Sequence, residues 1–179
     1  MNNPLDRAKG VRLVVLDVDG VLTDGSIWTG DNGELVKRFY TRDGLGIKML
    51  QAAGIPVAIL TGRLSAQTAA RAKELGITCV KQGKRFKTDA WNEILTEHGL
   101  NAEQTAYMGD DVPDLPVLRL AGLACVPADA SEEVMPLAHW VSQKNGGNGA
   151  VRSMAELILK AQGKWDALIV KHYVQGDLS

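Results

Sequence analysis

The chain has 179 residues, of which 45% are hydrophobic and 23% are charged. These proportions are typical of a globular protein and exclude a disordered chain or a coiled coil. With 20 basic and 21 acidic residues, the chain lacks the strong basic excess of a nucleic-acid-binding protein. No apolar stretch is long enough to cross a membrane, and residues 1–7 lack the apolar core of a signal peptide. We therefore expect a cytoplasmic protein that binds neither nucleic acid nor membranes.

Six short apolar runs alternate with amphipathic segments along the chain. Because each run is almost continuously apolar, it favours a strand of a parallel sheet that is covered on both faces. Cys79 and Cys125 lie within two of these runs, so we expect both to be reduced and buried. The predicted strands cover residues 11–18, 56–60, 77–80, 105–108, 123–126 and 139–141.

Apolar residues recur at helical spacing between these runs. Most of the predicted helices end at a glycine, and Ser65 is a candidate N-cap. Strand–helix alternation of this kind predicts an α/β fold, a doubly wound parallel sheet of Rossmann-like type. The predicted helices cover residues 43–53, 65–75, 88–98 and 114–120.

Two further segments depart from this alternation. Residues 26–40 contain two strand-like runs around a Gly-Asp-Asn-Gly turn, which predicts a β-hairpin insertion. Residues 150–179 form a C-terminal tail that is expected to be helical, with an interruption near Gly163. We expect residues 1–179 to form a single domain.

Acidic residues gather after two of the predicted strands. Asp17 and Asp19 follow the first strand, and Asp110, Asp111 and Asp114 follow the fourth. Ligands of a doubly wound sheet bind beyond the carboxyl ends of its strands, where these carboxylates could meet. Oxygen ligands without histidine or cysteine suit Mg²⁺. The alternative is that these aspartates only form turns and cap helices.

Candidate phosphate-binding groups follow the second and third predicted strands. Thr61 and Gly62 come after the second strand, at a position where a hydroxyl and a helix start can bind an anion. Lys87 stands immediately before the third predicted helix, where a cation opposes the helix dipole and so is not explained by local stability. Taken singly, the Thr-Gly pair is also a common turn, and the neighbouring Lys84 and Arg85 suit a solvated basic turn.

The order of these motifs resembles the haloacid dehalogenase superfamily of aspartate-nucleophile phosphohydrolases. The motifs are Asp-x-Asp-Gly at residues 17–20, Thr-Gly at 61–62, Lys87, and Gly-Asp-Asp-x-x-Asp at 109–114. Within the superfamily, residues 17–25, 42–48, 82–83, 109–116 and 146–150 are similar to the family of phosphatases that act on 3-deoxy-D-manno-octulosonate 8-phosphate. The segments between motifs are too short for a cap domain, so the resemblance implies a capless enzyme.

The resemblance implies a role for each acidic motif. Asp17 would be the nucleophile that forms an aspartyl-phosphate, and Asp19 would act as general acid and then general base. Mg²⁺ would be the cofactor, held by Asp17, Asp110 and the backbone carbonyl of Asp19. Asp111 and Asp114 would not bind the metal directly. They would orient the metal's water ligands and Lys87.

The resemblance also implies how phosphate and sugar are bound. Thr61 and Lys87 would bind the transferring phosphoryl group. A substrate with both a phosphate and a carboxylate requires several cations. The expected substrate-binding residues are Asp19, Arg42, Asp43, Gly44, Lys48, Arg63, Arg71 and Lys87.

The family's assembly is a homotetramer in which the hairpins pack together and neighbouring subunits cover each active site. We expect the same here, in an enzyme of lipopolysaccharide biosynthesis with a phosphorylated sugar acid as its small-molecule partner. The alternative is that the hairpin folds over its own domain. Ser153 stands where the family often has an acidic residue, which weakens the prediction that the tail contacts a neighbour.

Three other functions remain open at this point. A phosphatase for a related nine-carbon sugar acid 9-phosphate would keep every catalytic residue. A capless phosphoprotein phosphatase would keep the chemistry but favour a monomer with an open site. A receiver-like signalling domain also uses Asp, Mg²⁺, Thr and Lys, but its phospho-acceptor follows the third strand, where this chain has no aspartate.

Overall fold

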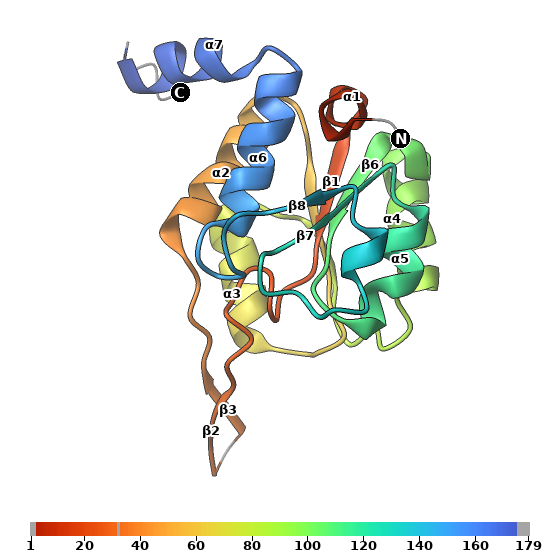
Figure 1. The fold of residues 1–179 in the computed structure, drawn as a ribbon. Helices are drawn as coiled ribbons and strands as arrows, with labels where there is room; N and C mark the ends of the chain where they lie inside the picture. The colour runs from red at the N-terminus through yellow and green to blue at the C-terminus, as the bar shows by residue number, and fades with distance from the viewer. Residues whose placement is uncertain (1–2, 32, 175–179) are drawn as a thin grey trace.

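A parallel six-stranded sheet forms the centre of the structure, a computed structural model that describes residues 3–31 and 33–174 (Figure 1). Every strand pair in this sheet is parallel, and all six predicted strands are present. The fold is therefore the predicted doubly wound α/β type. In the order β5-β4-β1-β6-β7-β8, the strands are β5 (Cys79–Lys81), β4 (Val57–Leu60), β1 (Leu13–Leu16), β6 (Thr105–Met108), β7 (Leu123–Val126) and β8 (Trp140–Val141).

The strand order reverses direction at β1. From β1 the chain first adds β4 and β5 on one side, and then returns to add β6, β7 and β8 on the other. The crevice at the carboxyl ends of β1 and β6 is thus the topological switch point, where ligands of such sheets bind.

Helices cover both faces of the sheet and create two apolar layers. Successive side chains of a strand point to opposite faces, and all four residues of β1 are fully buried. Val14 and Leu16 belong to one layer and Leu13 and Val15 to the other, which explains why β1 is continuously apolar. The first layer is covered by α1 (Pro4–Lys9), α2 (Thr41–Ala52), α3 (Ala66–Leu75), α6 (Ala150–Ala161) and α7 (Trp165–Ile169), and the second by α4 (Lys87–His98) and α5 (Leu115–Leu120).

Local capping signals set the ends of the helices. The Ser65 hydroxyl accepts a hydrogen bond from the amide of Thr68 at 3.3 Å, so the predicted N-cap of α3 is confirmed. Gly76 ends α3 with a φ of +71°, a left-handed conformation that glycine adopts without strain. α1 was not among the predicted helices, although Asn3 caps it and Pro4 opens it. Single 3₁₀ turns cover Ala102–Gln104, Val112–Asp114 and Met135–Leu137.

The predicted hairpin segment forms an antiparallel pair of strands, β2 (Trp28–Gly30) and β3 (Gly33–Val36). Figure 1 shows the hairpin pointing away from the sheet and its helices. Its turn includes residue 32, which lies outside the described residues. The hairpin is therefore a separate two-stranded sheet that does not extend the six-stranded sheet.

The C-terminal tail is helical as far as the structure describes it. α6 packs on α2 and ends before Gly163, whose φ is +65°, as the predicted interruption requires. α7 and a π-helical turn, Val170–Val174, follow, and residues 175–179 of the predicted tail lie outside the described residues. In the part of the chain that the structure describes, no helix is both long and apolar enough to span a membrane.

Candidate active site

Side chains from three strand ends and from the start of α4 meet at the switch point of the sheet. Asp17 directly follows β1, Thr61 directly follows β4, and Lys87 is the first residue of α4. Asp110 lies two residues beyond β6, and the adjacency of β4, β1 and β6 brings these groups together. They border a cavity of about 320 Å³, lined by Asp17, Asp19, Gly20, Gly25, Thr61, Gly62, Arg63, Lys87, Asp110, Asp111, Pro113 and Asp114.

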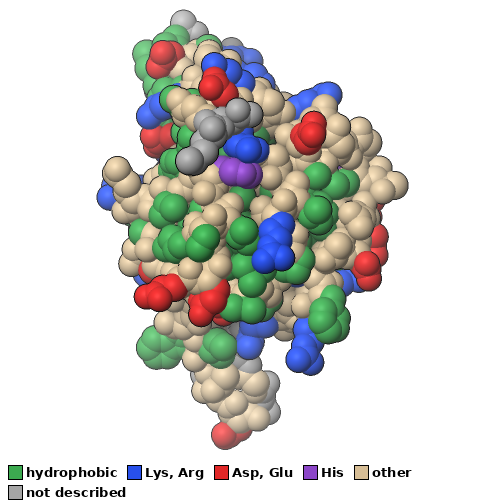
Figure 2. Space-filling view, turned by 45° about the vertical axis from the view of Figure 1, so that its right-hand side comes forward, with side chains coloured by type: hydrophobic (Ala, Val, Ile, Leu, Met, Phe, Trp, Pro, Cys, Tyr) green, Lys and Arg blue, Asp and Glu red, His purple; other side chains and the backbone are tan. Residues whose placement is uncertain are grey.

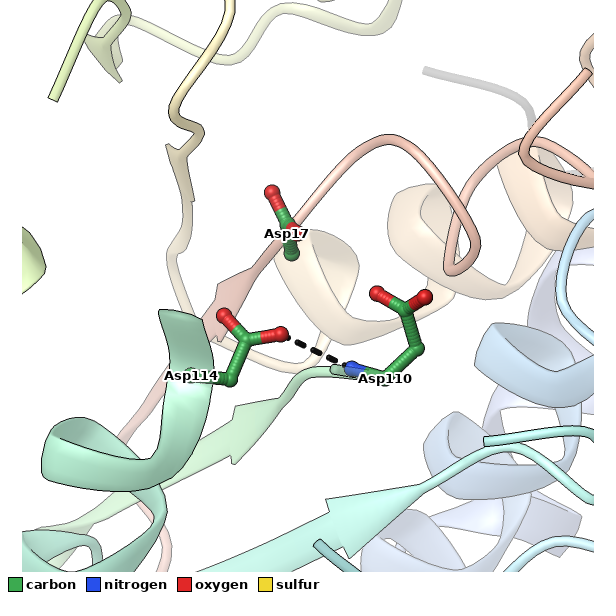
Figure 3. Close-up of side chains that lie close together, drawn as sticks. All are labelled: Asp17, Asp110 and Asp114. Atoms are coloured by element: carbon green, nitrogen blue, oxygen red, sulfur yellow. Dashed lines mark hydrogen bonds between the residues drawn. The ribbon is translucent and has the colours of Figure 1, made fainter. Parts of the chain in front are cut away.

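Three carboxylates share one end of this cavity. Figure 3 shows Asp17, Asp110 and Asp114 around a common space, and each offers an oxygen within 4.8 Å of the others. Burial raises the pKa of Asp17 to about 6, with Lys87 acting against the rise. Burial also raises the pKa of Asp110 to about 8, and the negative charges of Asp17 and Asp114 add to it. Such crowding of negative charge indicates a site built for a cation.

The unsatisfied oxygen of Asp17 supports a metal site. Asp17 Oδ2 lies 3.0 Å from the Nζ of Lys87, whereas the buried Oδ1 has no hydrogen-bond partner. A buried carboxylate oxygen without a partner costs free energy unless a ligand occupies it. Gly20 leaves the room that the Asp110 carboxylate needs, since a Cβ there would lie 2.0 Å from Asp110 Oδ2. Carboxylate oxygens in this arrangement fit Mg²⁺.

Asp114 is a poor candidate for a ligand because its oxygens are already used. Its Oδ1 accepts hydrogen bonds from Lys87 Nζ and from the Tyr107 hydroxyl, each at 2.5 Å. Its Oδ2 accepts the backbone amides of Asp110 at 2.9 Å and Asp111 at 3.2 Å. This carboxylate therefore ties the loop after β6 to Lys87, and its predicted role in orienting the metal's waters stays a prediction.

Lys87 stays charged in this environment. Its side chain is 2% exposed, and burial alone would lower its pKa, but Asp17 and Asp114 raise the pKa overall. Tyr107, which the sequence analysis missed, is fully buried and keeps its proton because burial and Asp114 raise its pKa well above the ordinary value. A phenol hydroxyl among the small and apolar residues of β6 was the only sequence signal for this residue.

Asp19 is paired with two cations. Lys37 donates a hydrogen bond to its Oδ1, and the Nε of Arg63 lies 3.7 Å from its Oδ2. Lys37 comes from the residues after β3 and was not among the predicted site residues. Nothing in the local sequence distinguishes it from an ordinary surface lysine.

Five predicted substrate-binding residues lie outside this cavity. Asp43 is 1% exposed, and its carboxylate accepts the amides of Gly149 at 3.2 Å and Arg152 at 2.8 Å, at the start of α6. Gly44 is buried where a Cβ would lie 2.3 Å from the guanidinium of Arg71 and 3.2 Å from Leu75. In this single chain Asp43 and Gly44 therefore join α2 to α6 and α3, and the expectation that they contact substrate stays a prediction.

The other three residues are cations around α2 and α3, of which Arg42 and Lys48 are exposed and Arg71 is largely buried. Arg42 lines a second hollow of about 470 Å³ beside the start of α6. Lys48 lies near Gly76 at the C-terminus of α3, where a cation is favourable. Arg71 pairs with Glu74 at 2.8 Å and stacks on the ring of Phe39. A single chain does not bring these three to the cavity, so their contact with substrate stays a prediction.

We predict that Asp43→Ala destabilises the protein. Two amides at the start of α6 lose a buried carboxylate acceptor, which should lower the free energy of unfolding by about 1–3 kcal/mol. Urea unfolding of Asp43→Ala and of Asp6→Ala would measure this. Asp6 is an exposed acid in the first turn of α1, so its replacement should have little effect. A raised KM with unchanged stability would instead favour direct substrate binding by Asp43.

Comparisons with known proteins identify the family of this chain. Residues 42–122 match the family model of haloacid dehalogenase-like hydrolases. The chain is 46% identical over 160 residues to the 3-deoxy-D-manno-octulosonate 8-phosphate phosphatase KdsC of Yersinia pestis, covering 89% of this chain and 86% of that one. It is 44% identical to KdsC of Escherichia coli K12 over the same length, which covers 89% of this chain and 85% of that one.

Solved structures agree with this result. The phosphatase from Moraxella catarrhalis, in complex with magnesium, phosphate and KDO, superposes with a TM-score of 0.91 at 43% identity and covers 94% of this chain and 97% of that one. The Yersinia pestis phosphatase superposes with a TM-score of 0.90 at 44% identity, covering 92% and 89% of the two chains. The receiver-domain alternative is therefore excluded. By its sequence identity over most of its length, this chain belongs to the 3-deoxy-D-manno-octulosonate 8-phosphate phosphatase family of haloacid dehalogenase-like hydrolases.

Proposed function

We propose that this protein hydrolyses 3-deoxy-D-manno-octulosonate 8-phosphate to 3-deoxy-D-manno-octulosonate and inorganic phosphate, in lipopolysaccharide biosynthesis. The observation that carries the proposal is the cavity in which Asp17, Asp110 and Lys87 meet at the switch point of the sheet. Family membership supports the choice of substrate, because the Moraxella catarrhalis relative is described with magnesium, phosphate and KDO.

The acidic end of the cavity would hold the cofactor. Asp17 and Asp110 would bind Mg²⁺ through their carboxylates, and the backbone carbonyl of Asp19 is the proposed third protein ligand. When bound, Mg²⁺ supplies positive charge that offsets the repulsion between the phosphate dianion and the attacking carboxylate.

Asp17 would carry out the first chemical step. One carboxylate oxygen attacks phosphorus, and the bond from phosphorus to the sugar oxygen breaks, which leaves an aspartyl-phosphate. Lys87, held by Asp114 and Tyr107, would bind the oxygens of the transferring group with its buried charge. The Thr61 hydroxyl would bind the same group from the end of β4.

Asp19 would move the protons of both steps. The departing sugar alkoxide is strongly basic, so Asp19 gives it a proton as the phosphorus–oxygen bond breaks. The resulting carboxylate then takes a proton from the water that attacks the aspartyl-phosphate. This second step releases inorganic phosphate and restores both Asp17 and protonated Asp19.

A panel of phosphorylated sugars tests the proposed substrate. Phosphate release is measured with Mg²⁺ and with EDTA for the eight-carbon 8-phosphate, a nine-carbon sugar acid 9-phosphate, a phosphopeptide and a simple hexose phosphate. We expect Mg²⁺-dependent release that is fastest from the eight-carbon acid. Faster release from the nine-carbon acid would keep the mechanism and change the substrate, and release from none would overturn the proposal.

Mg²⁺ should stabilise the protein more at alkaline than at acidic pH. Burial raises the pKa of Asp17 to about 6 and that of Asp110 to about 8, so below these values the metal must displace protons. The rise in unfolding temperature caused by Mg²⁺ should therefore be smaller at pH 5 than at pH 8. Asp110→Asn should lose most of the rise at both pH values. An equal rise in the wild type at the two pH values would contradict the assigned ligands.

We also propose that the protein is a homotetramer in the cytoplasm. Large apolar side chains are exposed on the hairpin, at Ile27 and Trp28, and beside the cavity, at Leu64, Phe86 and Val112. Figure 2 shows the hairpin projecting from the body, with hydrophobic side chains on the surface near its base. Exposed apolar groups around a polar cavity are typical of a surface that another chain covers.

The mass in solution tests this assembly. Light scattering should give four chains for the wild type, and fewer for a Trp28→Asp, Phe86→Asp double variant. The double variant should also lose turnover of the sugar phosphate if neighbours complete the site. A monomeric wild type would favour the hairpin folding over its own chain and would remove the proposed covering of the cavity.

A further inference from the structure

Lys37 makes an unusual contact for a residue at the base of a hairpin. It directly follows β3, and its side chain is 1% exposed. Its ammonium donates a hydrogen bond to Oδ1 of Asp19. Burial of an ammonium is costly unless oxygen acceptors compensate for lost water, and Oδ1 of Asp19 is one such acceptor.

The neighbouring Arg38 makes a different set of contacts. Its guanidinium lies 3.2 Å from Asp24 Oδ2 and 3.0 Å from Asn148 Oδ1, and its side chain is 53% exposed. Arg38 therefore anchors the base of the hairpin to the surface, whereas Lys37 reaches the active-site cavity. Only the Lys37 contact involves a residue that lines the cavity.

The contact fixes one oxygen of Asp19. The residue lies in the loop after β1 and its side chain is 21% exposed, so packing alone does not set its orientation. With Oδ1 held by Lys37, Oδ2 is the oxygen on the side of Arg63, another residue that lines the cavity. Proton transfer requires the carboxylate within hydrogen-bond reach of the leaving oxygen.

We propose that Lys37 is a positioning residue that holds Asp19 in the orientation for proton transfer through Oδ2. The proposal rests on the proposed function, in which Asp19 protonates the leaving sugar oxygen. On this proposal the base of the hairpin contributes to catalysis, because Lys37 acts on Asp19 of its own chain. Lys37 itself contacts neither the substrate nor the reacting atoms.

The leaving group provides a test that a general structural defect would not mimic. A sugar alkoxide must be protonated as it leaves, whereas p-nitrophenolate leaves without a proton. The ratio kcat/KM reports the steps up to departure of the leaving group, so the later attack of water does not enter it. Loss of Lys37 should therefore lower kcat/KM for the sugar phosphate much more than for p-nitrophenyl phosphate.

The central variant is Lys37→Met, with Lys37→Arg as the conservative variant and Arg38→Met as the matched control. We expect Lys37→Met to lower kcat/KM for the sugar phosphate by about 10- to 100-fold, with little change for p-nitrophenyl phosphate. Lys37→Arg keeps the cation and should restore part of the loss. Arg38→Met should leave the ratio between the two substrates unchanged. The unfolding temperature of each variant is measured first, and Lys37→Gln replaces Lys37→Met if the latter does not fold.

An Asp19→Ala background separates positioning from other effects. Asp19→Ala should also lower kcat/KM more for the sugar phosphate than for p-nitrophenyl phosphate. Adding Lys37→Met to Asp19→Ala should not widen this difference between the two substrates. An equal loss for both substrates in Lys37→Met, or a further loss in the double variant, would overturn the proposal. A wild type that hydrolyses neither substrate would instead overturn the proposed function on which it rests.

Discussion

Asp17→Asn should abolish phosphate release, with a loss of about 10⁴-fold or more in kcat for every substrate. An amide oxygen is too weak a nucleophile to form the phospho-enzyme. The loss should be independent of the leaving group, because attack on phosphorus is required whatever departs. Steady-state phosphate release and acid-quench trapping of ³²P-labelled enzyme measure both consequences.

The same substitution should not unfold the protein. Burial raises the pKa of Asp17 to about 6, so the folded wild type without metal loses stability as pH rises from about 4 to 6. An asparagine does not titrate, and in EDTA the variant should therefore gain stability relative to the wild type as pH rises through this range. Asp89→Asn, the same change at an exposed acid of α4, should alter neither activity nor this pH dependence. A folded Asp17→Asn variant with more than a few per cent of wild-type activity would refute the assigned nucleophile.

Lys87→Met should lower both stability and activity. The ammonium is 2% exposed and lies 3.0 Å from Asp17 and 2.5 Å from Asp114, so its removal leaves two buried carboxylates without their cation. Loss of one partner from such a group should reduce the free energy of unfolding by about 3–5 kcal/mol. Activity should fall by about 10²-fold or more, because the phosphoryl oxygens lose a preorganised positive charge.

The pH dependence distinguishes this effect from a simple packing defect. Without Lys87 the carboxylates hold protons more tightly in the folded state, so the loss of stability should be smaller at pH 5 than at pH 8. Urea unfolding in EDTA at the two pH values measures this difference. Arg85→Met, at an exposed cation two residues earlier, serves as the control. A loss of equal size at both pH values would contradict the electrostatic explanation.

The local pattern of the chain was enough to predict the parallel sheet and the edge at which its polar residues gather. The apolar runs that became β1, β4 and β6 must be covered on both faces, and glycines and Ser65 marked where helices end and begin. Parallel strands place their carboxyl ends at one edge, so the residues after each strand had to converge there. The convergence of Asp17, Thr61, Lys87 and Asp110 could be predicted for this reason, whereas their catalytic roles rest on the resemblance to haloacid dehalogenase phosphatases and stay predictions.

The contacts around these residues depend on how distant segments of the chain pack together. Lys37 lies 18 residues from Asp19 in the chain, and the position of the hairpin base brings them together. The contact of the Asp43 carboxylate with backbone amides of α6 depends on the packing of α2 on α6. Strands and helices are favoured by residues that are near one another in sequence, so they can be predicted from the sequence. Contacts between distant segments depend on how the layers pack, and no local pattern encodes that.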